Sequence, residues 1–389
     1  MASGNARLGM WMIGARGSVA TTTMVGMAAI RAGLTSPVGC VTELSDFRPA
    51  ALARFDDLVF GGHDIGTVPL VKRAEQLALA GVVPVHLLDH VKDELAAADK
   101  EIKPGVTDLP SGRTQAEAAA GLVADLVSFR QRHRLARVVV VNVASTEPTP
   151  PESAAHASLS RLREAMSSAG SVVPTSSLYA YAAFTAGCSY INFTPSAGAG
   201  LPALDELSRA CAVPYAGNDG KTGETLVKSA LAPMFAHRAL PVRSWSGTNL
   251  LGGGDGATLA EPARAHSKTR SKSRVLESVL GHPVEGIVHI DNVPELGEWK
   301  TAWDHILFEG FLGVRMTLQF TWQGCDSTLA APLVLDLVRL LGRAHETGHV
   351  GPQGQLAFFF KDPVATDEHR LVMQYEALRS WARSLGPHR

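Results

Sequence analysis

Short apolar runs alternate with longer amphipathic segments along the first half of this chain. The run Leu8–Ile13 predicts a buried strand of a parallel sheet, and the glycine-bearing turn after it predicts a helix that begins near Ser18. Residues 38–44 (VGCVTEL) predict the next strand. Together these segments predict a βαβ unit at the start of the chain.

The same alternation continues further along. Residues 66–134 are polar, alanine-rich and helical in pattern, and residues 136–146 (ARVVVVNVAST) form an apolar strand that ends in small polar residues. Residues 174–196 predict a helix, a strand at 189–193 and a loop. A short strand, a glycine-bearing turn and a helix starting near Thr222 follow. Ligands of open α/β sheets bind beyond the carboxyl ends of such strands.

The sequence pattern changes near residue 230, where apolar and polar residues alternate more regularly and predict mixed or antiparallel strands. Residues 326–348 predict a long amphipathic helix that stops at a glycine, and residues 356–363 (LAFFFKDP) predict a strand that rejoins the first sheet. We therefore predict an α/β protein with a Rossmann-like, doubly wound parallel sheet that is discontinuous in sequence. Residues 1–227 and 326–389 would form this domain, and residues 228–325 a second α/β domain with a mixed sheet.

Composition and charge exclude several classes of protein. The 389 residues carry a formal net charge of −1, so no overall electrostatic field attracts the protein to nucleic acid or to a membrane. Only 6% of the residues are aromatic, which argues against a surface that stacks on nucleic-acid bases. The four cysteines form no C-x-x-C pair, which favours a reducing cytoplasm over a disulfide framework or a zinc site. The N-terminus lacks the features of a signal peptide, and LGMWMIG is too short to span a bilayer.

The first turn, G-A-R-G-S-V-A, is a candidate dinucleotide site. Its spacing is G-x-x-G-x-x-A, so it departs from the usual fingerprint, but the helix start still offers free N–H groups to a pyrophosphate. Glu43, at the end of the second predicted strand, would bind a ribose and favour NAD over NADP. The alternatives are an ordinary strand–helix turn and an exposed loop acid.

Two further glycine-bearing loops carry charged groups. Asp219, Lys221 and Thr222 cluster at a predicted helix start, where hydroxyls cap and anions are favoured, although Asn-Asp-Gly is more often a simple turn. Residues 247–256 contain five glycines around Asp255 and could press their backbone against a ligand or form a flexible hairpin end. His63 has no second histidine at ligand spacing, which favours a packing role.

Lys268 and Lys272 lie four residues apart in a segment of helical pattern. Like charges one turn apart destabilise a helix by a few tenths of a kcal/mol, roughly, and an anion facing them would offset that cost. A solvated basic face is the alternative.

These motifs, in this order, resemble the myo-inositol-1-phosphate synthase family, particularly its archaeal and short bacterial members. The resemblance spans nearly the whole chain and runs through GARGSVATT, FGGHDI, VNVASTEP, YINFTPS, AGNDGKTGETLVK, the lysine pair, ELGEWKTAWDH, DSTLAAPLVLDLVR and FFFKDP. It implies a homotetrameric enzyme with an NAD domain and a catalytic domain. It also implies conversion of the sugar phosphate D-glucose 6-phosphate to 1L-myo-inositol 1-phosphate. The steps would be oxidation at C5, enolisation, attack of C6 on the C1 aldehyde and reduction by the same cofactor.

The resemblance also assigns site residues. Lys268 matches a lysine placed for proton transfer at the C5 oxygen, Lys272 and Lys300 match lysines around the C5 and phosphate oxygens, and Lys361 matches a lysine at the C1 oxygen. Asp326 would hold the charge of Lys300. The implied NAD-binding residues are Gly14, Ala15, Arg16, Gly17, Ser18, Asp64, Ala144, Ser145, Thr146, Asp219, Thr222 and Gly223, with Asn249 and Asp255 near the nicotinamide and substrate. Members differ in using a divalent metal or a monovalent cation beside the NAD phosphates.

The chain departs from the family pattern in three places. Ser246-Gly247-Thr248-Asn249 stands where a tyrosine is common, Gly253 and Gly254 stand where bulkier or polar residues precede the aspartate, and Glu298 stands where an aspartate precedes the lysine by two residues. The first change motivates an alternative, a related cyclase that closes fructose 6-phosphate to a five-membered cyclitol phosphate. A plain dehydrogenase, which would release NADH, and a non-catalytic sugar-phosphate sensor are the remaining alternatives.

Overall fold

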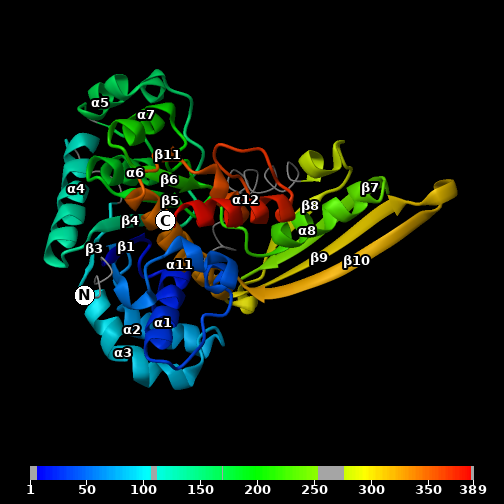
Figure 1. Cartoon of the computed structure of the whole chain (residues 1–389), viewed down its shortest axis with the longest axis horizontal. Helices are drawn as coiled ribbons and strands as arrows, with labels where there is room; N and C mark the ends of the chain where they lie inside the picture. Colours follow the sequence, from blue (N-terminus) through cyan, green and yellow to red (C-terminus); the bar gives the residue numbers. More distant parts are fainter. Residues whose placement is uncertain (1–6, 107–111, 169, 253–275, 387–389) are drawn as a thin grey trace.

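Two sheets organise the computed structural model, which describes residues 7–106, 112–168, 170–252 and 276–386. A seven-stranded sheet has the order β11-β6-β5-β4-β1-β2-β3, and a four-stranded sheet has the order β10-β9-β7-β8. Figure 1 shows the first sheet enclosed by helices and the second extending away from it as a long arm. This architecture confirms the predicted fold class.

All neighbours in the seven-stranded sheet run parallel. Its strands are β1 (Leu8–Ile13), β2 (Leu58–Asp64), β3 (Ile102–Pro104), β4 (Arg137–Asn142), β5 (Ser189–Asn192), β6 (Pro214–Gly217) and β11 (Gly351–Pro352). Ile13 lies opposite both His63 and Asn142, so three carboxyl ends meet at one level. This edge of a parallel sheet is where ligands bind.

Helices cover both faces of this sheet, as doubly wound folds require. One face packs against α1 (Ser18–Arg31), α2 (Leu70–Leu79), α3 (Val85–Asp99) and α11 (Asp326–Glu346). The other packs against α4 (Gln115–Arg132), α5 (Leu159–Met166), α6 (Thr175–Thr185) and α7 (Pro202–Ala210). Along β1, Met10 and Met12 enter the first core while Trp11 and Ile13 enter the second, because successive strand residues point to opposite faces.

The mixed sheet consists of β7 (Val242–Leu251), β8 (Val288–Asn292), β9 (Trp299–Glu309) and β10 (Arg315–Cys325). β7 pairs parallel with β8 and antiparallel with β9, which confirms the predicted mixed character. Helix α8 (Glu224–His237) packs on one face through Phe235, against Trp245 and Ile306. The chain then returns through α11 to the first sheet and ends in α12 (Leu371–Ser384).

The strand predicted at residues 38–44 is wrong. The segment contains a short 3-10 helix, η1 (Val41–Glu43), and further 3-10 helices follow at η2 (Ser45–Ala50) and η3 (Phe55–Asp57). The backbone N–H groups of Val41 and Thr42 donate to the buried carboxylate of Asp336, so a side chain satisfies the donors that a sheet partner would. The place beside β1 is taken by β2.

The strand predicted at residues 356–363 is also wrong. The first half of the segment lies in a 3-10 helix, η7 (Gly354–Phe359), whose side chains Leu356 and Phe359 are buried in the first core. A continuous apolar run indicates a segment that is buried on all sides, but it does not by itself distinguish a buried strand from a buried turn of helix. Two further 3-10 helices, η4 (Ala154–Ala157) and η6 (Phe311–Gly313), lie in connections, as does η5 (Pro294–Leu296).

The other predicted elements of the parallel sheet are confirmed within a few residues. Helix α8 starts at Glu224, two residues after its predicted start, since the Thr222 side chain bonds elsewhere and Gly223 takes the N-cap position. The long helix α11 stops just before Gly348, whose φ of +83° suits a glycine. No helix in the described ranges has both the length and the apolar character to cross a membrane.

Candidate functional site

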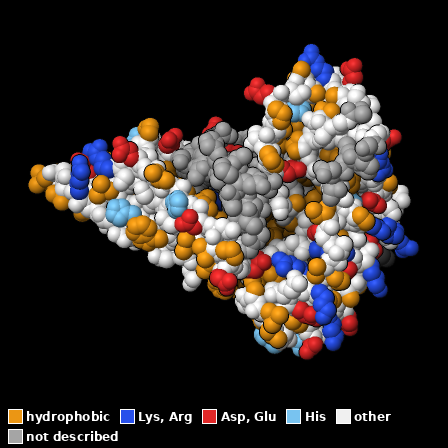
Figure 2. All heavy atoms as spheres, turned by 180° about the vertical axis from the view of Figure 1, so that it is seen from behind, with side chains coloured by type: hydrophobic (Ala, Val, Ile, Leu, Met, Phe, Trp, Pro, Cys, Tyr) orange, Lys and Arg blue, Asp and Glu red, His pale blue; other side chains and the backbone are white. Residues whose placement is uncertain are grey.

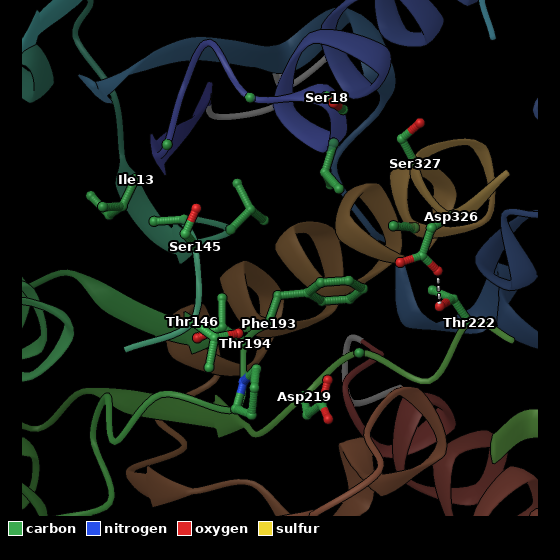
Figure 3. Close-up of a pocket in the computed structure, with 18 of the residues that line it drawn as sticks. Ile13, Ser18, Ser145, Thr146, Phe193, Thr194, Asp219, Thr222, Asp326 and Ser327 are labelled. Atoms are coloured by element: carbon green, nitrogen blue, oxygen red, sulfur yellow. Dashed lines mark hydrogen bonds between the residues drawn. The ribbon is translucent and has the colours of Figure 1, made fainter. Parts of the chain in front are cut away.

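A cavity of about 920 Å³ opens at the carboxyl ends of the parallel strands. Its walls come from the β1–α1 turn, the loops after β4, β5 and β6, the inward face of β7 and β9, and the first turn of α11. In Figure 3, Ser18 and Asp326 approach this space from one side, and Thr146, Thr194 and Asp219 approach it from the other. Segments far apart in sequence thus share one site.

The β1–α1 turn has the geometry of a phosphate-binding turn. Gly14 has a φ of +83°, and a Cβ at this position would lie 2.9 Å from the Ala144 Cα. Its N–H donates to the His63 carbonyl, and Gly17 N–H donates back to the Gly14 carbonyl, each at 3.0 Å. Helix α1 then starts at Ser18, and no side chain in the described part of the chain caps it, so its first N–H groups are available to an anion.

Asp64, the last residue of β2, lines the cavity beside the glycine turn. Its carboxylate accepts hydrogen bonds from Arg16 N (2.6 Å) and Gly66 N (2.5 Å), which fix it at the cavity wall. Glu43 does not share this place. It lies in η1, pairs with Arg339 at 2.6 Å and is not among the described residues that line the cavity, because the strand expected to carry it does not form.

Two lysines face the cavity with carboxylate partners. Lys300 Nζ lies 2.6 Å from Asp326 Oδ2, and the Thr222 hydroxyl donates to Asp326 Oδ1 at 2.5 Å. Lys361 Nζ lies 2.9 Å from Asp219 Oδ1, and Lys361 N–H donates to the Asp219 carbonyl at 2.7 Å. Each ammonium is therefore held in one orientation beside the space that the glycine turn borders.

Asp219 is the most constrained of these residues. It is 5% exposed, has a φ of +61°, and donates its N–H to the Thr194 carbonyl. Its Oδ2 atom is buried and has no hydrogen-bond partner in the described part of the chain. A buried carboxylate oxygen without a donor is costly, so a ligand hydroxyl or amide in the cavity would stabilise it.

The charge of Lys361 follows from these surroundings. Burial alone would lower the pKa of Lys361, but the Asp219 and Asp326 carboxylates outweigh it and raise the pKa above its ordinary value. Lys361 is therefore a fixed positive charge at neutral pH. It can stabilise a developing oxyanion but is a poor base.

The wall near the glycine turn holds one charged residue, Arg73, that the sequence did not single out, beside Ser18 and Glu298. The Ser18 hydroxyl donates to Glu298 Oε1 at 2.8 Å, and Arg73 Nη2 donates to both Ser18 Oγ (2.7 Å) and Glu298 Oε1 (3.2 Å). Arg73 lies on α2, where no local pattern marks it. Thr194 could have been found, because it follows a predicted strand on the ligand-binding edge.

The cavity gathers most of the predicted site residues. Those that line it are Gly14, Arg16, Gly17, Ser18, Asp64, Ala144, Ser145, Thr146, Asp219, Thr222, Gly223, Asn249, Lys300, Asp326 and Lys361. Ala15 is fully buried behind the turn. Asp255, Lys268 and Lys272 lie outside the described residues, so their predicted roles stay predictions.

The metal expectation has no cluster to support it in the described ranges. Among those residues, no group of three or more His, Cys, Asp and Glu side chains is arranged to hold an ion. His63 accepts from Trp11 Nε1 at its Nδ1 atom, and its Nε2 lies 3.1 Å from Asp125 Oδ2. It is the hydrogen-bonded packing histidine that the sequence favoured.

Known sequences match this chain along nearly its whole length. The family profile described as Myo-inositol-1-phosphate synthase matches residues 8–383. Inositol-3-phosphate synthase 1 of Bacteroides thetaiotaomicron is 34% identical, and the match covers 97% of this chain and 95% of that protein.

Solved structures share the fold. Inositol-3-phosphate synthase of Caenorhabditis elegans superposes with a TM-score of 0.89 at 22% identity, covering 98% of this chain and 86% of that one. A myo-inositol-1-phosphate synthase-related protein of Thermotoga maritima gives a TM-score of 0.77 at 24% identity, covering 98% and 100%.

Proposed function

Because this chain belongs to the myo-inositol-1-phosphate synthase family, we propose that it converts D-glucose 6-phosphate to 1L-myo-inositol 1-phosphate with NAD as a regenerated cofactor. The observation that carries the proposal is the convergence of two carboxylate-held lysines, Lys300 and Lys361, with the glycine turn on one cavity. Hydride transfer alone needs no such set of fixed cations. A ring closure that develops negative charge on two oxygens does.

The residues of the cavity fit NAD. The turn at Gly14 and Gly17 and the start of α1 would hold the pyrophosphate, and Asp64 would hold the adenosine ribose. Asp219 Oδ2, which has no hydrogen-bond partner among the described residues, offers a further acceptor in the cavity. Bound NAD would supply the hydride acceptor at C5 and return the hydride after ring closure. The remaining chemistry falls to the side chains.

The two described lysines would have separate tasks. Lys361, whose pKa is raised by Asp219 and Asp326 against the effect of burial, stays protonated and would stabilise the oxygen at C1 during closure. Lys300, oriented by Asp326, would stabilise the C5 or phosphate oxygens. We further propose that Lys268 and Lys272 complete the charge around the substrate, with Lys268 transferring the proton at the C5 oxygen, and that Asp255 lies near the nicotinamide.

The alternative five-membered closure gains no support from the described residues of the altered stretch, while Gly253 and Gly254 lie outside the described residues. Ser246, Gly247 and Thr248 form part of β7, and none of them is among the described residues that line the cavity. Ser246 and Thr248 alternate with Asn249 and so point to the opposite face of the sheet. The departure from the family pattern therefore leaves the described wall of the cavity unchanged.

Product analysis tests the function directly. The protein is incubated with NAD and either glucose 6-phosphate or fructose 6-phosphate, and the product is identified by NMR while absorbance is followed at 340 nm. We expect an inositol phosphate from glucose 6-phosphate and no net NADH. A five-membered cyclitol phosphate would identify the related cyclase, and NADH formed in proportion to product would identify a dehydrogenase.

We also propose a homotetramer located in the cytoplasm, with residues 228–325 as the catalytic and assembly domain. The exposed face of the mixed sheet supports the assembly, and the buried state of Cys40 and Cys188 and the part-buried state of Cys211 are compatible with a reducing compartment.

A further inference from the structure

Three charged side chains are buried together at the cavity wall, and one of them, Glu224, is among the residues that line the cavity. The side chains of Lys228 and Asp304 are 0% exposed, and that of Glu224 is 3% exposed. The Lys228 ammonium contacts Glu224 Oε1 one helical turn away and lies 3.5 Å from Asp304 Oδ1. Trp245 Nε1 donates to the same Asp304 oxygen at 2.7 Å. We call Glu224, Lys228 and Asp304 the buried triad.

Stability alone explains the buried triad poorly. Two carboxylates face one ammonium, and Asp304 Oδ2 has no hydrogen-bond partner among the described residues. Burial raises the pKa of Asp304; the Lys228 ammonium opposes this rise and the Glu224 carboxylate adds to it. Replacing buried ion networks with apolar residues is often neutral or stabilising, so such a cluster calls for another role.

The position of Asp304 on β9 links the buried triad to the cavity. Lys300, Ala302 and Asp304 are every second residue of β9 and therefore share its inward face. At roughly 3.3 Å per residue, Lys300 lies about 13 Å from Asp304 along the strand. Opposite Asp304 lies Gly247 of β7. A Cβ there would come within 3.0 Å of Asp304 Oδ1 and 3.2 Å of Glu224 Oε1, so the glycine leaves room for both carboxylates.

The start of α8 is tied to β9 at two points. Glu224 and Lys228, in its first turns, join Asp304. Just before the helix, Thr222 bonds Asp326, which pairs with Lys300. The start of α8 is thus joined to β9 both at Asp304 and, through Asp326, at Lys300, and the strand fixes the distance between these two residues. If the contact at Asp304 is lost, the contact at Lys300 should shift as well.

We propose that the buried triad is a positioning device that holds the start of α8 against β9 so that Lys300 stays aligned with Asp326 in the cavity. The benefit to catalysis rests on the proposed function. The alignment itself is a property of the protein and can be measured without the substrate.

The test uses the double variant K228M/D304N. It removes the link between α8 and β9 with side chains of similar shape, leaves Glu224 in place, and keeps the formal charge of the cluster at −1. K228M alone leaves two facing buried carboxylates and should unfold at lower urea concentration. K72M is the matched control, because Lys72 also pairs with a glutamate about one helical turn away, Glu75, but its side chain is 66% exposed.

We expect the double variant to fold and to have a urea midpoint between those of K228M and the wild type, since one buried carboxylate loses its ammonium instead of two. KM for NAD should stay within about threefold, and kcat should fall roughly tenfold to a hundredfold, as small misplacements of a catalytic group do. Competitive acetylation of the NAD-bound protein, read residue by residue by mass spectrometry, should show the labelling midpoint of Lys300 moving to lower pH, since its carboxylate partner is less well aligned. K72M should change neither.

Wild-type kcat and an unchanged Lys300 midpoint in a folded double variant would overturn the proposal. If the wild-type protein forms no cyclitol phosphate, the proposed function fails separately, and the labelling comparison still decides: a shifted Lys300 midpoint supports the positioning role, and an unshifted one overturns it.

Discussion

At the scale of single residues, the site depends on which carboxylate each lysine meets. The resemblance identified Lys300, Lys361, Asp219 and Asp326 as site residues from sequence. It paired Lys300 with Asp326 but assigned Asp219 only to the cofactor, whereas the structure pairs Asp219 with Lys361, 142 residues away. No local sequence pattern predicts a contact between residues so far apart. The position of Lys361 depends on η7, a 3-10 helix that the sequence pattern predicted as a strand.

Removing the Lys300 charge should slow turnover strongly without unfolding the protein. We expect Lys300→Met to lower kcat by about a hundredfold to a thousandfold, the usual loss of one preorganised electrostatic group. Affinity for NAD, measured by calorimetry, should change little, since the Lys300 ammonium is held by Asp326 and not by the backbone of the glycine turn. Lys92→Met, at an exposed ion pair, is the control; equal kcat in the two variants would contradict the role.

Lys221 should give the protein a characteristic pH dependence of stability. Lys221 is 4% exposed, its Nζ donates to Gln374 Oε1 at 2.5 Å, and burial lowers its pKa to about 7. In the unfolded chain its pKa is about 10.4, so between these values the unfolded state binds more protons. The free energy of unfolding should therefore rise with pH from about 7 towards 10.

Urea unfolding at several pH values checks this in the wild type and in Lys221→Met. Below pH 7 both states of the wild type carry the proton and the contribution is constant. The variant should lack the rise above pH 7, so the two curves should differ in slope. Parallel curves across this window would show that Lys221 does not titrate as its burial implies.

At the scale of elements, strands flanked by clear turns were predictable and irregular connections were not. Leu8–Ile13, 137–142 and 189–192 formed as expected because they are apolar runs with glycine or polar ends. Residues 38–44 look equally apolar, but Asp336 of α11 binds their backbone and draws them into η1. Glu43 therefore lies away from the described cavity lining, whereas Asp64 is part of it, and the role of Asp64 at the ribose stays a proposal.

The β1–α1 turn gives a prediction at this scale. Gly14→Ala would place a Cβ 2.9 Å from Ala144 in a backbone conformation that disfavours side chains, so the turn must deform. We expect NAD affinity, measured by calorimetry, to fall at least about tenfold. Strain in the backbone should also reduce stability by about 1 kcal/mol.

Gly33→Ala separates the two effects. Gly33 also has a positive φ, +68°, but a Cβ there meets nothing within 4 Å, and the residue lies beyond the far end of α1. It should show the same loss of stability with wild-type NAD affinity. If both variants lost NAD equally, general destabilisation rather than the shape of the turn would be the cause.

At the scale of the whole molecule, the sequence predicted the return of the chain to the first sheet but not the extent of the second. Figure 1 shows β9 and β10 reaching far beyond α8, which covers the inward face only. Trp299 and Trp303 both lie on the outward face of β9. Phe311 and Leu312, in the connection from β9 to β10 at the end of the arm, are 90% and 85% exposed. Figure 2 shows apolar side chains gathered at the end of this arm.

Such an arm should be covered in solution. β10 is an eleven-residue strand that pairs only with β9 in the described sheet, and long unprotected edges invite pairing with another chain. A second copy of the chain is the partner that the proposed homotetramer supplies. Light scattering should then give a mass near four times the 41.1 kDa of one chain.

Two glutamates on the arm should break this assembly. We expect Trp303→Glu/Phe311→Glu to shift the light-scattering mass to dimer or monomer, because each buried carboxylate at an interface loses its hydration without a partner. Val38→Glu/Leu79→Glu is the matched control, since both apolar residues are exposed on the larger body, 84% and 90%. Circular dichroism must show that all forms stay folded. A tetramer that survives the arm variant but not the control would move the interface from the mixed sheet to the helices around the parallel one, and the arm would then need a different partner.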